Sequence, residues 1–231
     1  MKLMLFLNRP APQSTDAFRE ALLAFLDVLP EAFTAIRLAL ADEAVAPAQP
    51  LAMLSTAHPH DAMVSVKVAD GGDSALLRGG LPPLAAGTGA YQVDEREPLH
   101  HEAAPGRVEG MCQVAMFRKP AHLTREQWLD IWLNSHTQVA IDTQSTFSYR
   151  QNVVAAVLPL AGDATYVGPV YDAIVEEQFP AAAMTDRSAF YAAPGDTARY
   201  KANEQAMIES VMRFIDFAGF ECVPMSEYRL R

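Results

Sequence analysis

One predicted helix in the second half of the chain carries an aromatic stripe that ends in a histidine. Trp128, Trp132 and His136 are spaced four residues apart, so they lie along one side of a helix. The chain has only 2 tryptophans, and because residues this large are highly buried we expect the stripe to face the core. An imidazole, with an ordinary pKa of about 6.5, suits a general acid or base at neutral pH. The residues leave a second interpretation open: a core histidine satisfied by a carbonyl or a carboxylate.

Polar residues also gather on a predicted strand at residues 147–156. It carries Tyr149, Arg150, Gln151 and Asn152 in succession. Because side chains alternate between the faces of a strand, some of these groups must point inward, where they could bind the oxygen atoms of a small ligand. We take Tyr149 as the strongest candidate for a catalytic role and Asn152 as a binding residue.

The next predicted strand, at residues 170–179, carries two carboxylates and a tyrosine that could serve the same site. Alternation divides its polar residues between two faces, with Asp172 and Glu176 on one and Tyr171 and Glu177 on the other. A buried carboxylate needs a partner or a function. We expect Asp172 to orient His136 or raise its basicity, with Tyr171 as a binding residue. A structural ion pair with Arg118 or Arg150 is the alternative.

The remaining candidate ligands predict neither a metal site nor a cofactor. His58-Pro59-His60-Asp61 and His100-His101-Glu102 are expected in exposed loops. The two isolated cysteines, Cys112 and Cys222, are too few for a disulfide framework or a zinc ribbon and are expected to be buried. No glycine-rich phosphate-binding motif is present in the sequence.

The composition is that of a folded protein that does not bind nucleic acid. Among 231 residues, 50% are hydrophobic and 20% are charged, and 28 acidic against 18 basic residues give a net charge of -10. That charge repels nucleic acid and anionic membranes. The apolar run near the N-terminus is shorter than the ~7–15 residues of a signal-peptide core, and no window reaches the ~18 residues of a membrane span. We therefore expect a soluble, cytoplasmic protein.

The same order of elements is predicted twice. Each half reads strand, helix, strand, strand, helix, strand: 2–7, 14–29, 33–41, 62–69, 74–78 and 89–95, then 111–118, 124–136, 147–156, 170–179, 197–217 and 220–228. This order predicts an α+β fold of two ferredoxin-like β-α-β-β-α-β units, residues 1–99 and 110–231, joined by a segment at 100–109. Since the strands are apolar on both faces, we expect the two antiparallel sheets to pack back to back, so that one chain forms its own pseudo-dimer. A monomer is then sufficient, and a homodimer stays open.

The second half, about residues 111–228, resembles the EthD domain family of the dimeric α+β barrel superfamily. The matching segments are Phe117-Arg118-Lys119-Pro120, Leu123 to Trp128, Trp132 to His136, Tyr149 to Asn152, and Tyr171 to Glu176. Where that family usually has an aromatic residue after the acidic one, this chain has Glu177-Gln178. The first half matches only in its order of elements, and its first helix lacks a histidine, so it resembles a degenerate copy.

The resemblance implies that the two sheets form a dimeric α+β barrel within one chain. It also implies a cofactor-free pocket in the second half, with His136 as its central polar residue and Trp132 and Phe117 as walls. We take Trp128 as a further substrate-binding residue. Relatives in the superfamily include cyclases, dehydratases, isomerases, cofactor-free monooxygenases and haem-degrading enzymes. We expect a lyase or isomerase acting on a hydrophobic, oxygenated, aromatic or polycyclic small molecule. In this hypothesis His136 abstracts a proton next to a carbonyl and Tyr149 holds the enolate oxygen. Two alternatives stay open: a non-catalytic binding or accessory protein of a degradation pathway, and a haem- or oxygen-using monooxygenase.

Overall fold

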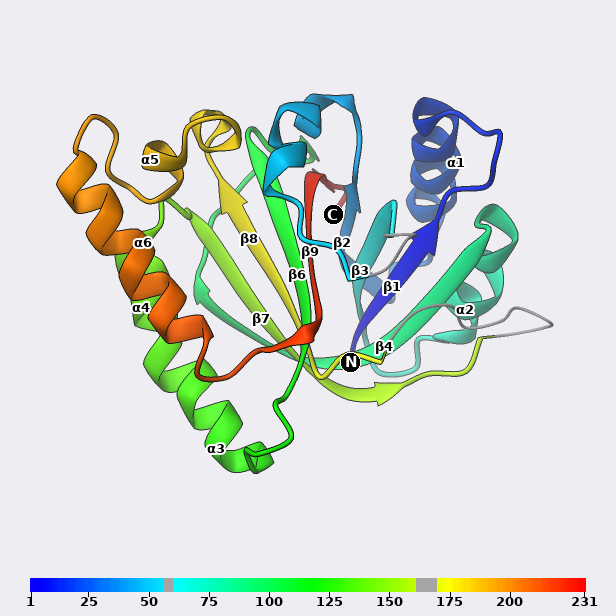
Figure 1. Ribbon diagram of the computed structural model, residues 1–231. Coiled ribbons are helices and arrows are strands. Elements are labelled where there is room, and N and C mark those ends of the chain that lie inside the picture. Colours follow the sequence, from blue (N-terminus) through cyan, green and yellow to red (C-terminus); the bar gives the residue numbers. More distant parts are fainter. Residues whose placement is uncertain (56–59, 161–169) are drawn as a thin grey trace.

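The computed structural model describes residues 1–55, 60–160 and 170–231 (Figure 1). His58 of the histidine-containing loop, and the glycines at 162 and 168, lie outside the described residues. Within the described part of the chain, every helix is too short or too polar to cross a membrane.

Eight antiparallel strands form a closed ring. Its order is β2 (Phe33–Leu40), β3 (Ala62–Val68), β1 (Lys2–Asn8), β4 (Gly87–Leu99), β7 (Ser148–Val157), β8 (Ala173–Phe179), β6 (Met111–Arg118) and β9 (Asp216–Arg229), and β9 pairs again with β2. A two-residue strand, β5 (Gly106–Arg107), pairs with β9 outside the ring. The architecture is an eight-stranded antiparallel barrel with helices on its outside.

The predicted barrel within one chain is confirmed, and its two sheets are joined at their edges. The halves pair edge to edge at two places, β4 with β7 and β2 with β9. These pairings satisfy the backbone groups that free sheet edges would leave open. Each half contributes its strands in the same order of second, third, first and fourth, while the hypothesis that the halves are copies of one another stays a prediction.

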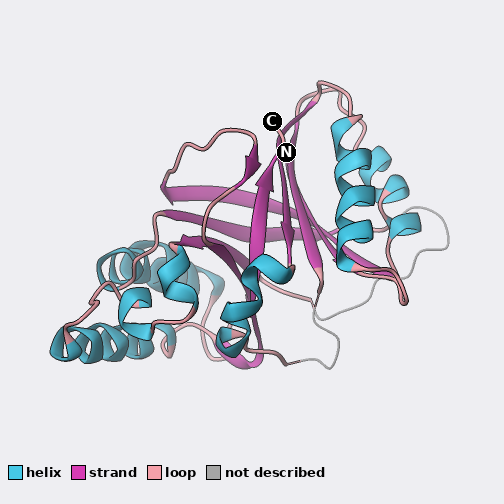
Figure 2. Ribbon diagram, turned by 90° about the horizontal axis from the view of Figure 1, so that it is seen from above, coloured by secondary structure: helices cyan, strands magenta, loops and turns pink. Residues whose placement is uncertain are grey.

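The helices lie in two groups with the strands between them (Figure 2). The α-helices of the first half are α1 (Thr15–Asp27) and α2 (Ala75–Gly80). Those of the second half are α3 (Arg125–Leu129), α4 (Thr137–Thr143), α5 (Arg187–Phe190) and α6 (Thr197–Val211), with the π-helical segment η3 (Asp130–His136) between α3 and α4. Three short 3-10 helices, η1 (Glu43–Leu51), η2 (Pro82–Leu84) and η4 (Ala181–Met184), complete the described elements.

Two predicted boundaries in the second half are wrong. The helix that begins after Thr124 does not stop at His136 but continues through α4. The long helix, predicted over 197–217, ends at Val211, and the residues from Asp216 onward, Gly219 among them, belong to β9. A Cβ atom at Gly219 would stand 2.3 Å from the Arg118 guanidinium, so a larger residue there would displace the end of that side chain.

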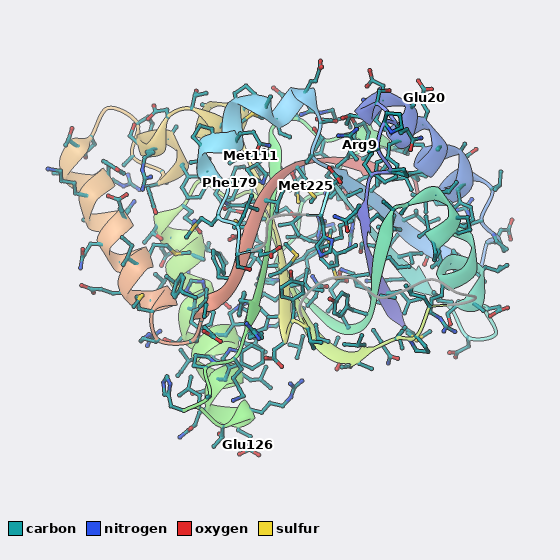
Figure 3. The ribbon with its side chains drawn as sticks, turned by 45° about the vertical axis from the view of Figure 1, so that its right-hand side comes forward. Arg9, Glu20, Met111, Glu126, Phe179 and Met225 are labelled. Carbon is teal, nitrogen blue, oxygen red and sulfur yellow. The ribbon has the colours of Figure 1, made fainter. Side chains whose placement is uncertain are left out.

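The barrel wall separates three apolar layers. Leu22 of α1 and its neighbours cover the outer face of the first half, while Trp132 and its neighbours cover that of the second. Phe6, Val114 and Ile174 point into the barrel. A smaller apolar cluster lies where β6 begins and β8 ends. There Met111 and Phe179 are paired across the two strands and lie close together (Figure 3). One wall therefore has a packed interior and two separately covered outer faces.

The interior also holds a buried network of ion pairs centred on Glu176. Its carboxylate lies 3.0 Å from Lys2 Nζ and 3.5 Å from Arg150 Nε, and Arg150 also pairs with Glu227. Lys2 in turn lies 2.6 Å from Glu95. Burial alone would raise the pKa of Glu176, but Lys2 and Arg150 outweigh it and hold that pKa well below its usual range. The carboxylate is therefore charged and tied to cations.

Replacing Glu176 with glutamine is expected to destabilise the protein by roughly 3–5 kcal/mol, because it leaves buried cations uncompensated. Urea denaturation measures the change in the free energy of unfolding. Glu20→Gln on the exposed face of α1 (Figure 3) is the matched control and should change it little. Equal stability of the two variants would contradict this account of the network.

Candidate active site

A cavity of about 490 Å³ lies between the helices and the outer face of the sheet in the second half. Its walls are mostly apolar, and they include Phe117, Trp132, Val175, Val211, Phe214 and Phe220. The polar residues that line it are Gln113, His136, Gln144, Tyr149, Glu177, Arg187 and Tyr191. Its volume falls within the roughly 300–1,000 Å³ usual for small-molecule sites.

The helix that bears His136 is fixed at both its start and its middle. Thr124 and Gln127 form a reciprocal capping box at its first turn. Trp128 Nε1 donates a hydrogen bond to the Phe214 carbonyl at 3.0 Å. The helix then continues as the wider π-helical segment η3, which ends at His136. Segments of this kind are frequent at functional sites, and here η3 ends with the imidazole at the cavity.

His136 is held from a second helix and is neutral at pH 7. Its Nδ1 lies 2.9 Å from Ser210 Oγ of α6, and its ring centroid lies 4.7 Å from that of Phe214. Burial, assisted by the charge of Arg213, lowers the pKa of His136 to about 4. Because Ser210 engages Nδ1, Nε2 is the nitrogen left for a molecule in the cavity.

Three polar side chains form a row across the strands that floor the cavity. Tyr149 of β7 lies opposite Glu177 of β8, and Glu177 lies opposite Gln113 of β6. The Tyr149 hydroxyl accepts a hydrogen bond from Gln151 Nε2 at 3.2 Å, and the same nitrogen donates to the Thr137 hydroxyl at 3.0 Å. Burial raises the pKa of Tyr149, so the phenol keeps its proton and can donate it to a ligand.

Glu177 is the residue of this site that sequence reasoning placed on a strand but did not assign a role. Its side chain is 7% exposed, and its Oε1 is buried with no hydrogen-bond partner in the described structure. Burial raises its pKa to about 8. Two signals could have identified it: alternation sets it on the face opposite Glu176, and it replaces an aromatic residue in the resemblance.

Four of the predicted site residues meet at the cavity, namely His136, Tyr149, Trp132 and Phe117. A fifth, Trp128, does not line it. Its ring lies 5.3 Å from that of Trp132 and supports the wall from behind.

The other three predicted site residues lie elsewhere. Asp172 accepts a hydrogen bond from the Lys119 backbone amide at 2.9 Å. Tyr171 and Asn152 face the barrel interior, where Tyr171 packs against Tyr91 and Asn152 lies 2.7 Å from Lys2 Nζ. The expectation that Asp172 orients His136 is therefore wrong, since Ser210 occupies that position.

The start of β8 explains where Tyr171 and Asp172 lie, and alternation along β7 explains where Asn152 lies. Residues 171 and 172 precede β8, which begins at Ala173, so the face assignment made for a strand does not extend to them. Asn152 is three residues beyond Tyr149 on β7, and an odd spacing turns it to the opposite face of the strand.

The loop histidines differ from expectation in one respect. His60 is buried, with its ring 4.9 Å from that of Phe6, whereas His100 is exposed beside Glu97. Within residues 1–55, 60–160 and 170–231, no three His, Cys, Asp or Glu side chains are grouped to hold a metal ion. Both cysteines are buried and free.

The sequence matches no protein-family model and no curated protein. Among solved structures, an anthrone oxidase-like protein aligns with a TM-score of 0.58 at 12% identity, over 100% of this chain and 91% of that one. A protein of Fusobacterium nucleatum subsp. nucleatum, provisionally named a monooxygenase, aligns at 0.45 with 8% identity, covering 100% and 91%. Another so named, from Lactobacillus acidophilus NCFM, aligns at 0.46 with 10% identity, covering 99% and 92%. At 12% identity, the likeness to the anthrone oxidase-like protein shows the fold alone. The EthD resemblance stays a prediction.

The neutral state of His136 has a measurable pH signature. With a pKa of about 4, its ring should not titrate between pH 5 and 8 in a nuclear magnetic resonance titration of the 6 histidines. Because the unfolded imidazole takes up its proton near pH ~6.5, the folded state should lose stability as pH falls from there toward 4. His136→Gln should remove the resonance and part of that loss. Titration of His136 near its ordinary pKa would contradict the buried environment.

Proposed function

We propose that this chain is a cofactor-independent enzyme in which His136 removes a proton from an apolar, oxygenated small molecule. The supporting observation is a neutral imidazole, held by Ser210 at the wall of a largely apolar cavity whose floor carries a tyrosine hydroxyl. A lyase or isomerase of the dehydratase or cyclase type is the reaction class that these groups serve best. The aromatic walls, Phe117, Trp132 and Phe214, favour a flat, aromatic or polycyclic substrate.

In this mechanism Nε2 of His136 accepts a proton from a carbon next to a carbonyl group. The electron pair of the broken C–H bond forms an enolate, whose oxygen accepts a hydrogen bond from Tyr149. Return of the proton to another carbon gives an isomer, and its delivery to a departing hydroxyl group gives water and an alkene. Proton transfer to a positioned side chain contributes about 10²–10⁴-fold to a rate, and a hydrogen-bond donor aimed at the developing charge adds about 10²–10³-fold.

Oxygenation is a second candidate, favoured by the likeness of the whole fold to the anthrone oxidase-like protein. Its first step is the same removal of a proton by His136. The carbanion would then react with O₂, so that a CH₂ group and one O₂ become a C=O group and one H₂O. Oxygen uptake distinguishes this reaction from a lyase or isomerase reaction, which consumes none.

We also propose that residues 110–231 form the half that bears the site and residues 1–99 a degenerate copy. The two halves contribute their strands to the barrel in the same order, but the helix α1 of the first half carries no histidine. Because one chain completes the ring, a monomer suffices for this site, and a cytoplasmic homodimer of such chains is compatible with it.

Hydrogen–deuterium exchange at the methylene group of anthrone, followed in D₂O under nitrogen, tests the proton-transfer role. This CH₂ group lies opposite the carbonyl in the central ring, and its deprotonation delocalises the charge through the flanking rings onto the carbonyl oxygen. The protein should accelerate the exchange, and His136→Ala should lower that acceleration by about 10²–10⁴-fold while the fold is kept. His122→Ala, which alters an exposed histidine, should behave as the unaltered protein. Equal exchange by His136→Ala would overturn the assignment, and tight binding without any exchange would favour the non-catalytic alternative.

A further inference from the structure

Glu176 and Glu177 are neighbours on β8, yet their carboxyl groups have opposite surroundings. Glu176 points into the barrel, where Lys2, Arg37 and Arg150 lie within 4 Å of its oxygens. Glu177 points to the outer face, lines the cavity, and forms no hydrogen bond or ion pair within the described residues. Two carboxyl groups that are adjacent in the sequence thus lie on opposite sides of the barrel wall, one with cations beside it and one without.

The groups that face Glu177 cannot neutralise a carboxylate. The neighbouring strands present Tyr149 from β7, Gln113 from β6 and Cys222 from β9, and burial raises the pKa of both the tyrosine and the cysteine, so both are neutral. The helical wall presents neutral His136, the amide of Gln144 and the hydroxyl of Tyr191, whose pKa is raised by burial.

Arg187 is the charged residue of the cavity lining, and it is committed elsewhere. Its guanidinium group pairs with Glu204, and its side chain is 59% exposed. An ionised carboxylate buried without a cation is costly enough that the group keeps its proton instead. The pKa of about 8, raised by burial, agrees with this argument from geometry.

We propose that Glu177 is protonated at neutral pH and donates a hydrogen bond to a carbonyl oxygen of the ligand, so that the cavity selects uncharged aromatic ketones over carboxylates. This inference rests on the proposed function, since it supplies a second donor for the same oxygen. Side chains directly opposite each other on paired strands have Cβ atoms about 4.5–5.5 Å apart, so Glu177 and Tyr149 can reach one oxygen together. A tyrosine beside a protonated carboxylic acid is an effective cradle for an enolate oxygen.

Binding can be measured without any turnover, because both tryptophans of the chain report on the cavity. Trp132 lines it and Trp128 packs behind Trp132. Quenching of their fluorescence by 9-fluorenone, an uncharged tricyclic ketone, gives an affinity, and fluorene-9-carboxylate is the charged counterpart. The variants are Glu177→Gln, which keeps a donor without a charge, and Glu177→Leu, which keeps neither. Glu126→Gln on the exposed side of α3 (Figure 3) is the matched control.

We expect the affinity of the unaltered protein for fluorenone to fall about tenfold from pH 7 to pH 9, because a group with a pKa of about 8 loses most of its protons over that range. Glu177→Gln should bind within about threefold of the unaltered protein at pH 7, and its affinity should not depend on pH. Glu177→Leu should bind about three- to tenfold more weakly, the effect of one lost hydrogen bond. Fluorene-9-carboxylate should bind more weakly than fluorenone, and Glu126→Gln should match the unaltered protein.

Three results would overturn the inference: affinity that rises with pH, equal pH dependence in Glu177→Gln, or preference for the carboxylate. An infrared titration gives a second readout that needs no ligand. The protonated-carboxyl band should persist at pH 7 in the unaltered protein and be absent from either variant, and its absence from the unaltered protein would also overturn the inference. The exchange assay with His136→Ala is independent of all these measurements. If proton transfer fails while the Glu177 variants behave as expected, the proposed reaction alone is rejected. If proton transfer is observed while the Glu177 variants do not behave as expected, the Glu177 inference alone is rejected.

Discussion

The closed barrel wall separates two electrostatic environments, and the proposed chemistry depends on that separation. Inside, the cations Lys2 and Arg150 keep Glu176 ionised. Outside, helices cover the wall with apolar side chains and leave Glu177 without a cation. A strand whose successive side chains face opposite ways can therefore carry two adjacent glutamates in different protonation states.

The outer environment is built from elements far apart in the sequence. The segment η3 supplies His136, α6 supplies its partner Ser210, and the strands supply Tyr149 and Glu177. Each of these side chains is held on a helix or strand. The hydrogen bond from Trp128 to Phe214 fixes α3 against the segment that follows α6. Polar groups on regular elements are positioned more accurately than groups on loops, which suits a site that must place a base and a donor around one ligand.

Sequence reasoning found the part of this site that depends on local spacing. A helical period of four identified Trp132 and His136, and strand alternation brought Tyr149 to the same cavity. It failed where the answer depends on tertiary structure. Ser210 approaches His136 from 74 residues away, the barrel closes through the pairing of β2 with β9, and the start of β8 at Ala173 decides which way Asp172 points. None of these contacts leaves a periodic pattern in the chain.

One physical cause, removal from water, acts on His136 and Glu177 with opposite signs. Burial lowers the pKa of the imidazole to about 4 and raises that of the carboxyl group to about 8, so both are uncharged at pH 7. An uncharged ligand can then enter without desolvating an ionised group of the cavity. In the proposed reaction, charge arises only when a proton passes from the ligand to His136, which forms an imidazolium and an enolate together. The pair is stabilised by donors already in place, because low polarity around them strengthens each hydrogen bond to the new negative charge. The burial that makes His136 a weak base therefore keeps the resting site uncharged, and in the proposed reaction the hydrogen-bond donors act on the charge that proton transfer creates.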